Sequence, residues 1–149
     1  MTLVIDASVA VKWFLPEEGH YGAKDLAKGD LRLIAPDLLI AELANVLRRK
    51  VRFGDMTAAQ GLEAVTRVTM PLSELVSSQK LIATGFTISS SMNHSVYDTM
   101  YLACALADPT AILDGKFAAK AAGAGYGEKV LTLADAVARF ATGQGKEHG

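Results

Sequence analysis

Leu3-Val4-Ile5-Asp6 and Ala111-Ile112-Leu113-Asp114 share one pattern, a short aliphatic run that ends in an aspartate. Each run precedes a helix-like stretch, which is typical of a strand buried on both faces of a parallel sheet. Ligands of open α/β sheets bind outside the carboxyl ends of such strands. Two carboxylates placed there from opposite ends of the chain predict a single site, and they indicate a divalent metal.

Composition limits the classes of protein that the chain can belong to. Its 149 residues predict one domain, residues 1–140, followed by a flexible C-terminal tail, 141–149. With 15 Lys and Arg against 16 Asp and Glu, the net charge of −1 excludes a global basic field, so any nucleic-acid binding must be local. The single cysteine, Cys104, excludes an internal disulfide framework and a Cys-based zinc site. With no leader and no membrane-spanning run visible, we expect a cytoplasmic protein that does not bind membranes.

Short apolar runs alternate with amphipathic stretches along the chain. This alternation predicts a three-layer α/β/α sandwich around a mostly parallel, five-stranded sheet. Thr87 to Asn93 is polar and Ser-rich, and we expect it to be a mobile loop. Strands are expected near 2–6, 31–35, 71–73, 110–113 and 129–132, and helices at 7–15, 18–28, 37–53, 57–69, 73–84, 95–107, 115–123 and 133–140.

Asp98 lies in an apolar run, Val96 to Leu106, that only Asp98 and Thr99 interrupt. A helix that is apolar on nearly all sides is expected to be buried, and a buried, unpaired carboxylate is costly. We therefore expect Asp98 to need a cation. The alternative is a structural acid that pairs with an arginine or caps a loop.

Glu42 is the one acid within the apolar segment Leu38 to Leu43. Asn45 and Arg49 follow it on the same side of the expected helix. This stripe is either part of a site or a solvated edge with a weak ion pair. The cations Arg48 to Lys50 stabilise a helix C-terminus or bind phosphate, and His94 is a general base or an ordinary loop residue.

Asp6, Glu42, Asp98 and Asp114 are thus candidates for one acidic cluster. Like charges raise one another's pKa, so four neighbouring carboxylates do not all stay ionised unaided. One or two Mg²⁺ or Mn²⁺ ions would resolve this repulsion, because hard cations prefer oxygen ligands. The chemistry that such ions support is phosphodiester hydrolysis.

Three stretches carry a resemblance to a known family: Val4 to Val9 followed by Lys12-Trp13, then Ala41 to Leu47, and finally His94 to Ala103. Together they resemble PIN-domain ribonucleases, and among these the VapC toxins of toxin–antitoxin pairs. The resemblance extends from Met1 to about Phe140. It implies an RNA substrate, a homodimer and inhibition by a VapB-type antitoxin protein.

The resemblance also implies roles for individual residues. Asp6, Glu42, Asp98 and Asp114 would be the catalytic, metal-binding acids, with Ser8 and Asn45 supporting the site. The family usually has Thr-Ala-Asp at the last acid, whereas this chain has Ile112-Leu113-Asp114 and lacks the supporting hydroxyl.

We expect a Mg²⁺- or Mn²⁺-dependent endoribonuclease, and two other functions are alternatives to it. One is a catalytically weak PIN-fold module that binds RNA or an antitoxin without efficient turnover. The other is a phosphatase that forms an aspartyl-phosphate, which would need a second acid where Ser8 stands. The identity of the RNA, the number of ions at rest and the identity of the antitoxin are not encoded in any motif.

Overall fold

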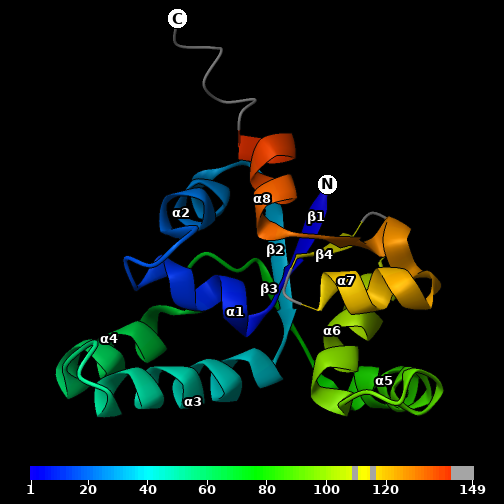
Figure 1. Ribbon diagram of the computed structural model, residues 1–149, viewed down its shortest axis with the longest axis horizontal. Helices are drawn as coiled ribbons and strands as arrows, with labels where there is room; N and C mark the ends of the chain where they lie inside the picture. The colour runs from blue at the N-terminus through cyan, green and yellow to red at the C-terminus, as the bar shows by residue number, and fades with distance from the viewer. Residues whose placement is uncertain (109–110, 115–116, 142–149) are drawn as a thin grey trace, which may run out of the picture.

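The computed structural model describes residues 1–108, 111–114 and 117–141, and it contains a five-stranded parallel sheet (Figure 1). The strand order is β3-β2-β1-β4-β5, and every neighbouring pair is parallel. The strands are β1 (Thr2–Ile5), β2 (Arg32–Pro36), β3 (Glu74–Val76), β4 (Ala111–Asp114) and β5 (Val130–Leu131).

Helices cover both faces of this sheet (Figure 1). The helices are α1 (Ala7–Ala10), α2 (His20–Lys28), α3 (Leu38–Arg52), α4 (Ala58–Arg67), α5 (Ser78–Met92), α6 (Val96–Leu106), α7 (Ala118–Ala121) and α8 (Leu133–Ala136). Four short helical segments complete the described chain: η1 (Val11–Trp13), η2 (Ala122–Tyr126), η3 (Gly127–Lys129) and η4 (Val137–Ala141). In Figure 1, α1 and α2 lie on one side of the sheet, with α6 and α7 on the other. The prediction of a three-layer sandwich is confirmed.

The core explains why the central elements form. Leu3, Val4 and Ile5 of β1 are all fully buried, as expected for a central strand covered on both faces. On α3, Leu39, Leu43 and Leu47 recur every four residues and are buried, so that helix has a single apolar face. Helix α6 is buried continuously from Thr99 to Ala105 and contacts β1, β2 and β4.

A tight approach fixes α6 against α5. The Thr99 hydroxyl donates a hydrogen bond to the Gly85 carbonyl at 2.7 Å. A side chain at Gly85 would place its Cβ 3.0 Å from Met100 Sδ, so a larger residue here would require the Met100 side chain to shift. This contact holds the helix that carries Asp98 in place.

The segment between β2 and α6 departs from expectation. The strand predicted at 71–73 lies at Glu74–Val76, and the helix predicted at 73–84 begins only at Ser78. The loop predicted at 87–93 is wrong, because α5 continues to Met92 and ends at Asn93, whose φ of 51° is left-handed. Leu81, Gly85 and Ile88 form a buried stripe, and this helical periodicity outweighs the polar composition of the intervening serines.

Other boundaries lie close to their predicted positions. Thr57 caps α4, and its side chain and that of Gln60 form a reciprocal capping box. No helix among the described residues is both long and apolar enough to cross a membrane. Residues 142–149, nearly all of the predicted tail, lie outside the described part of the chain.

Candidate metal centre

The first two candidate acids lie at the carboxyl edge of neighbouring central strands. Asp6 directly follows β1, and Asp114 is the last residue of β4, in register with Ile5. After β1 the chain continues to β2 on one side of the central strand pair, and after β4 it continues to β5 on the other side. The carboxyl ends of β1 and β4 therefore form the topological switch point of the sheet. The backbone of Asp114 thus lies beside that of Asp6, whereas the Asp114 side chain is outside the described part of the chain.

Asp6 is held rigidly by the turn that begins α1. Its Oδ1 accepts the Ser8 hydroxyl at 2.5 Å and the Val9 amide at 3.1 Å. Asp6 is therefore both the N-cap of α1 and a partly buried carboxylate. The second carboxylate oxygen, Oδ2, takes part in neither of these bonds.

Glu42 reaches the same region from α3. Its Oε1 is buried without a hydrogen-bond partner in the described structure, and so is the hydroxyl of neighbouring Tyr101. A buried, unsatisfied carboxylate oxygen is costly and requires an explanation. Sequence reasoning did not single out Tyr101, although it lies three residues after Asp98 and so shares its side of α6.

Asp98 does not have the environment expected for it. Its side chain is 46% exposed, so the prediction of a buried, unpaired acid is wrong. The buried part of α6 begins only at Thr99, so the first turn of this helix lies outside the core. Burial of Asp98 therefore does not follow from the apolar sequence around it. Asp98 Oδ2 is instead 2.6 Å from His94 Nε2.

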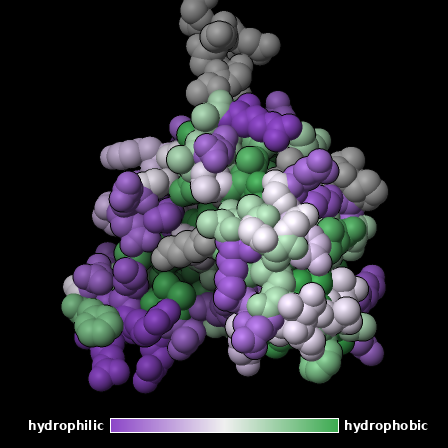
Figure 2. Space-filling model, turned by 45° about the vertical axis from the view of Figure 1, so that its right-hand side comes forward, coloured by the Kyte–Doolittle hydropathy of each residue, from purple (hydrophilic) through white to green (hydrophobic). Residues whose placement is uncertain are grey.

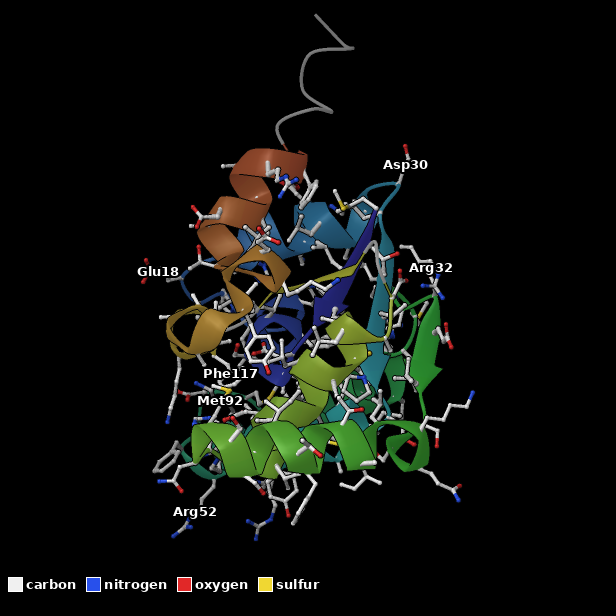
Figure 3. All side chains as sticks on the ribbon, turned by 90° about the vertical axis from the view of Figure 1, so that its right-hand side faces the viewer. Glu18, Asp30, Arg32, Arg52, Met92 and Phe117 are labelled. Atoms are coloured by element: carbon white, nitrogen blue, oxygen red, sulfur yellow. The ribbon has the colours of Figure 1, made fainter. Side chains whose placement is uncertain are left out.

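His94 is fixed by several contacts of its own. Its ring lies against that of Phe117, with a centroid distance of 4.7 Å and an interplanar angle of 30°. Its backbone carbonyl accepts the Ser89 hydroxyl, and its amide donates to the Ser89 carbonyl. Figure 3 shows the Phe117 ring near α6 and α7. His94 is thus held by α5 and by the residue that precedes α7.

Electrostatics indicates that the three described acids affect one another. Burial raises the pKa of Asp6 most, and the negative charge of Asp98 raises it further, while the hydrogen bonds from Ser8 and Val9 lower it. Burial also raises the pKa of Glu42, and the charges of Asp98 and Asp6 add to that effect. The nearby Tyr101 hydroxyl lowers the pKa of Glu42, although Glu42 Oε1 and the Tyr101 hydroxyl do not meet the geometry of a hydrogen bond with each other. Positive charge placed here would relieve the repulsion.

These side chains line one cleft of about 700 Å³. Asp6, Glu42 and Asp98 share it with Ser8, His94 and Tyr101, and Arg49, Lys50 and Lys120 also line it. Asn45 does not line it and is exposed elsewhere on α3. Figure 2 shows hydrophilic residues gathered at lower left, over the α3–α4 end of the molecule.

Within the described part of the chain, no group of three or more His, Cys, Asp or Glu side chains has the geometry of a metal site. The chemistry of the donors nevertheless suits Mg²⁺ or Mn²⁺, since all the described candidates are carboxylates. The unsatisfied Glu42 Oε1 is the observation that fits a cation best. The residues present are therefore compatible with a divalent ion.

Comparison with known proteins assigns the chain to a family. A model of the PIN domain matches residues 3–123, and the chain therefore belongs to the PIN-domain family. Proteins of this family are generally nucleases and generally use divalent metals.

A solved structure agrees with this assignment. The crystal structure of PAE2754 from Pyrobaculum aerophilum is similar, with a TM-score of 0.69 and 17% identity over 95% of this chain and 90% of that chain. At this identity the similarity concerns the fold alone. No curated protein matches the sequence significantly.

Proposed function

We propose that the protein is a Mg²⁺- or Mn²⁺-dependent endoribonuclease, in which Asp6, Glu42, Asp98 and Asp114 hold one or two ions. The observation that carries this proposal is the buried, unpartnered Oε1 of Glu42, in a cleft shared with Asp6 and Asp98. When bound, a divalent ion supplies a nucleophilic water at neutral pH and neutralises charge on the reacting phosphate.

The chain's own residues would arrange this chemistry. Ser8 and the Val9 amide bind Oδ1 of Asp6, which leaves Oδ2 for a ligand. His94 binds Oδ2 of Asp98 in the same way and leaves Oδ1. Asp6 and Asp98 thus each have one oxygen held by the protein, so the direction of these two carboxylates is set before a ligand arrives.

Cleavage of single-stranded RNA with added Mg²⁺ tests the proposal. We expect cleavage by the wild type, its loss in excess EDTA, and its loss in Asp98→Asn. Asp25 is exposed on α2 and lies outside the cleft, so Asp25→Asn is the matched control and should cleave like the wild type. Cleavage that persists in EDTA would contradict the metal mechanism.

We further propose that the protein is the toxin of a VapBC-type pair. The support is the resemblance of its three motifs to VapC toxins, which also implies a homodimer and a VapB-type antitoxin partner; the single cysteine is consistent with the further proposal that the protein acts in the cytoplasm. Growth arrest on expression, relieved by an antitoxin encoded next to this chain, would test the role. Normal growth despite active enzyme would contradict it.

A catalytically weak binding module is the second candidate. It is favoured by the strand end Ile112-Leu113-Asp114, which lacks the hydroxyl usual in the family. The same cleavage experiment decides, because such a module would bind RNA or an antitoxin but turn over little RNA even with Mn²⁺.

A further inference from the structure

The cleft extends beyond the acids along one face of α3. Glu42, Val46, Arg49, Lys50 and Phe53 all line it, at the spacing of a single helix face. At a rise of 1.5 Å per residue, Arg49 lies about 10 Å and Phe53 about 16 Å along the helix from Glu42. An extended chain lying in the cleft would therefore meet these residues in order.

Phe53 is an exposed aromatic residue within this cleft. It caps α3 and is 74% exposed, and Gly54, with φ of 84°, turns the chain away immediately after it. Other exposed aromatic residues, Tyr21, Phe86 and Tyr97, do not line the cleft. An exposed ring beside a charged groove is the arrangement on which unpaired bases stack.

The charge near Phe53 differs from that at the acids. Glu17 lies 3.5 Å from both Lys12 and Lys50, so these three side chains together carry a net charge of +1. Arg49 forms no ion pair within the described ranges and adds a further positive charge at this end of the cleft. Asp55 is the opposing acid at this end. The balance is positive here and negative around Asp6, Glu42 and Asp98.

We propose that Arg49 and Phe53 form a nucleotide subsite next to the acids, in which Arg49 binds a backbone phosphate and Phe53 stacks on an unpaired base. The inference rests on the proposed function, and it adds that the substrate is single-stranded on the α3 side of the cut. A base inside a duplex is already stacked and has no free face for Phe53.

The electrostatics favours RNA over a protein partner as the occupant of this subsite. A phosphate chain complements the positive end of the cleft, and a divalent ion would make the acidic end complementary as well. A partner protein that covers Phe53 would depend on the ring's apolar area and not on its aromatic face. Binding of RNA and binding of a partner protein should therefore respond differently to Phe53→Leu, which keeps an apolar side chain but removes the aromatic ring.

Binding of a short, fluorescein-labelled, single-stranded RNA of one defined sequence, measured by anisotropy in Ca²⁺, tests the subsite. Phe53→Leu should weaken binding about tenfold, and Phe53→Tyr should restore it, because stacking needs a ring. Phe86→Leu is the matched control, since Phe86 is 65% exposed but lies outside the cleft. The same RNA annealed to its complement should bind Phe53→Leu and the wild type alike.

The salt dependence of binding tests Arg49. Arg49→Ala should reduce the slope of log K against log salt by about 0.7, the value for one phosphate contact with a single strand. Arg52→Ala should leave it unchanged, because Arg52 lies on the same helix but points away from the cleft (Figure 3).

The outcomes separate this inference from the proposed function. Unchanged RNA binding in Phe53→Leu would overturn the subsite and leave Phe53 for a protein partner, even if the wild type cleaves RNA. Wild-type protein that binds RNA through Phe53 but never cleaves it would support the subsite and overturn the nuclease. Equal losses in Phe53→Leu and Phe86→Leu would also overturn the subsite.

Discussion

His94 Nε2 lies 2.6 Å from Asp98 Oδ2, and the two residues belong to the same short stretch between the end of α5 and the first turn of α6. The Phe117 ring and Ser89 hold the histidine in place from two other elements. Asp98 is therefore oriented by a neighbour that is itself fixed. Such partners of a metal-binding carboxylate tune its affinity for the metal.

Removal of the His94 ring should weaken metal binding without unfolding the protein. We expect His94→Ala to lower the affinity for Mn²⁺ by about 10- to 100-fold, because Asp98 then loses its orienting partner. His94→Gln, whose amide can donate to the same oxygen, should recover part of the loss. Titration calorimetry with Mn²⁺ measures both. Equal Mn²⁺ affinity in the wild type and His94→Ala would show that the contact is only structural.

Metal identity should control cleavage. Excess EDTA should abolish RNA cleavage, and Mg²⁺ or Mn²⁺ should restore it. Ca²⁺ should bind without restoring full activity, because its looser geometry positions an in-line attack poorly. Gel assays of a labelled RNA with each ion measure this. Full activity in Ca²⁺ would contradict the argument from geometry.

Three of the four candidate acids, Asp6, Asp98 and Asp114, should not contribute equally to the rate of cleavage. Asp6→Asn and Asp98→Asn should each remove about 3 kcal/mol of transition-state stabilisation, roughly a hundredfold in rate. Asp114→Asn should lose less, since its strand end lacks the supporting hydroxyl. Single-turnover rates at saturating Mg²⁺ give the ranking. A larger loss at Asp114 than at Asp98 would reverse it.

Glu42 should destabilise the metal-free protein at neutral pH. Its pKa in the folded state is raised, chiefly by burial, so the folded protein binds the proton more tightly than the unfolded chain does. Stability is therefore lost as the pH rises from the ordinary glutamate pKa towards the raised value. Glu42→Gln should accordingly stabilise the metal-free protein at pH 7, and should stabilise it much less near pH 4.

Thermal unfolding with and without Mg²⁺ completes this test. Metal stabilises the wild type by RT ln(1 + [L]/Kd), about 2.7 kcal/mol at a hundred times Kd, and should stabilise Glu42→Gln much less. Asp98→Asn is less suitable for this comparison than Glu42→Gln, because the Asp98 side chain is half-exposed and hydrogen-bonded to His94. A Glu42→Gln variant that is less stable at pH 7 and responds to Mg²⁺ like the wild type would make Glu42 a structural residue.

Several features of the fold follow from local sequence. The strands β1 and β4 are visible as aliphatic runs, and for β1 the reason is that a strand covered on both faces has no polar alternation. Thr57 and Gln60 mark the start of α4 through contacts within one turn. Such features depend on neighbours in the chain, so composition and spacing are sufficient to predict them.

The sequence by itself thus determined the parallel α/β architecture and which acids end or interrupt its apolar runs, since both depend on local periodicity. Only the tertiary structure decided that Asp98 is half-exposed beside His94. It also decided that Tyr101 lies next to Glu42 and that Phe53 lines the same cleft as the acids. The contacts of Glu42 and Phe53 join segments that are distant in the chain. These contacts and the exposure of Asp98 depend on how α3, α5 and α6 pack around the sheet, which no local pattern specifies.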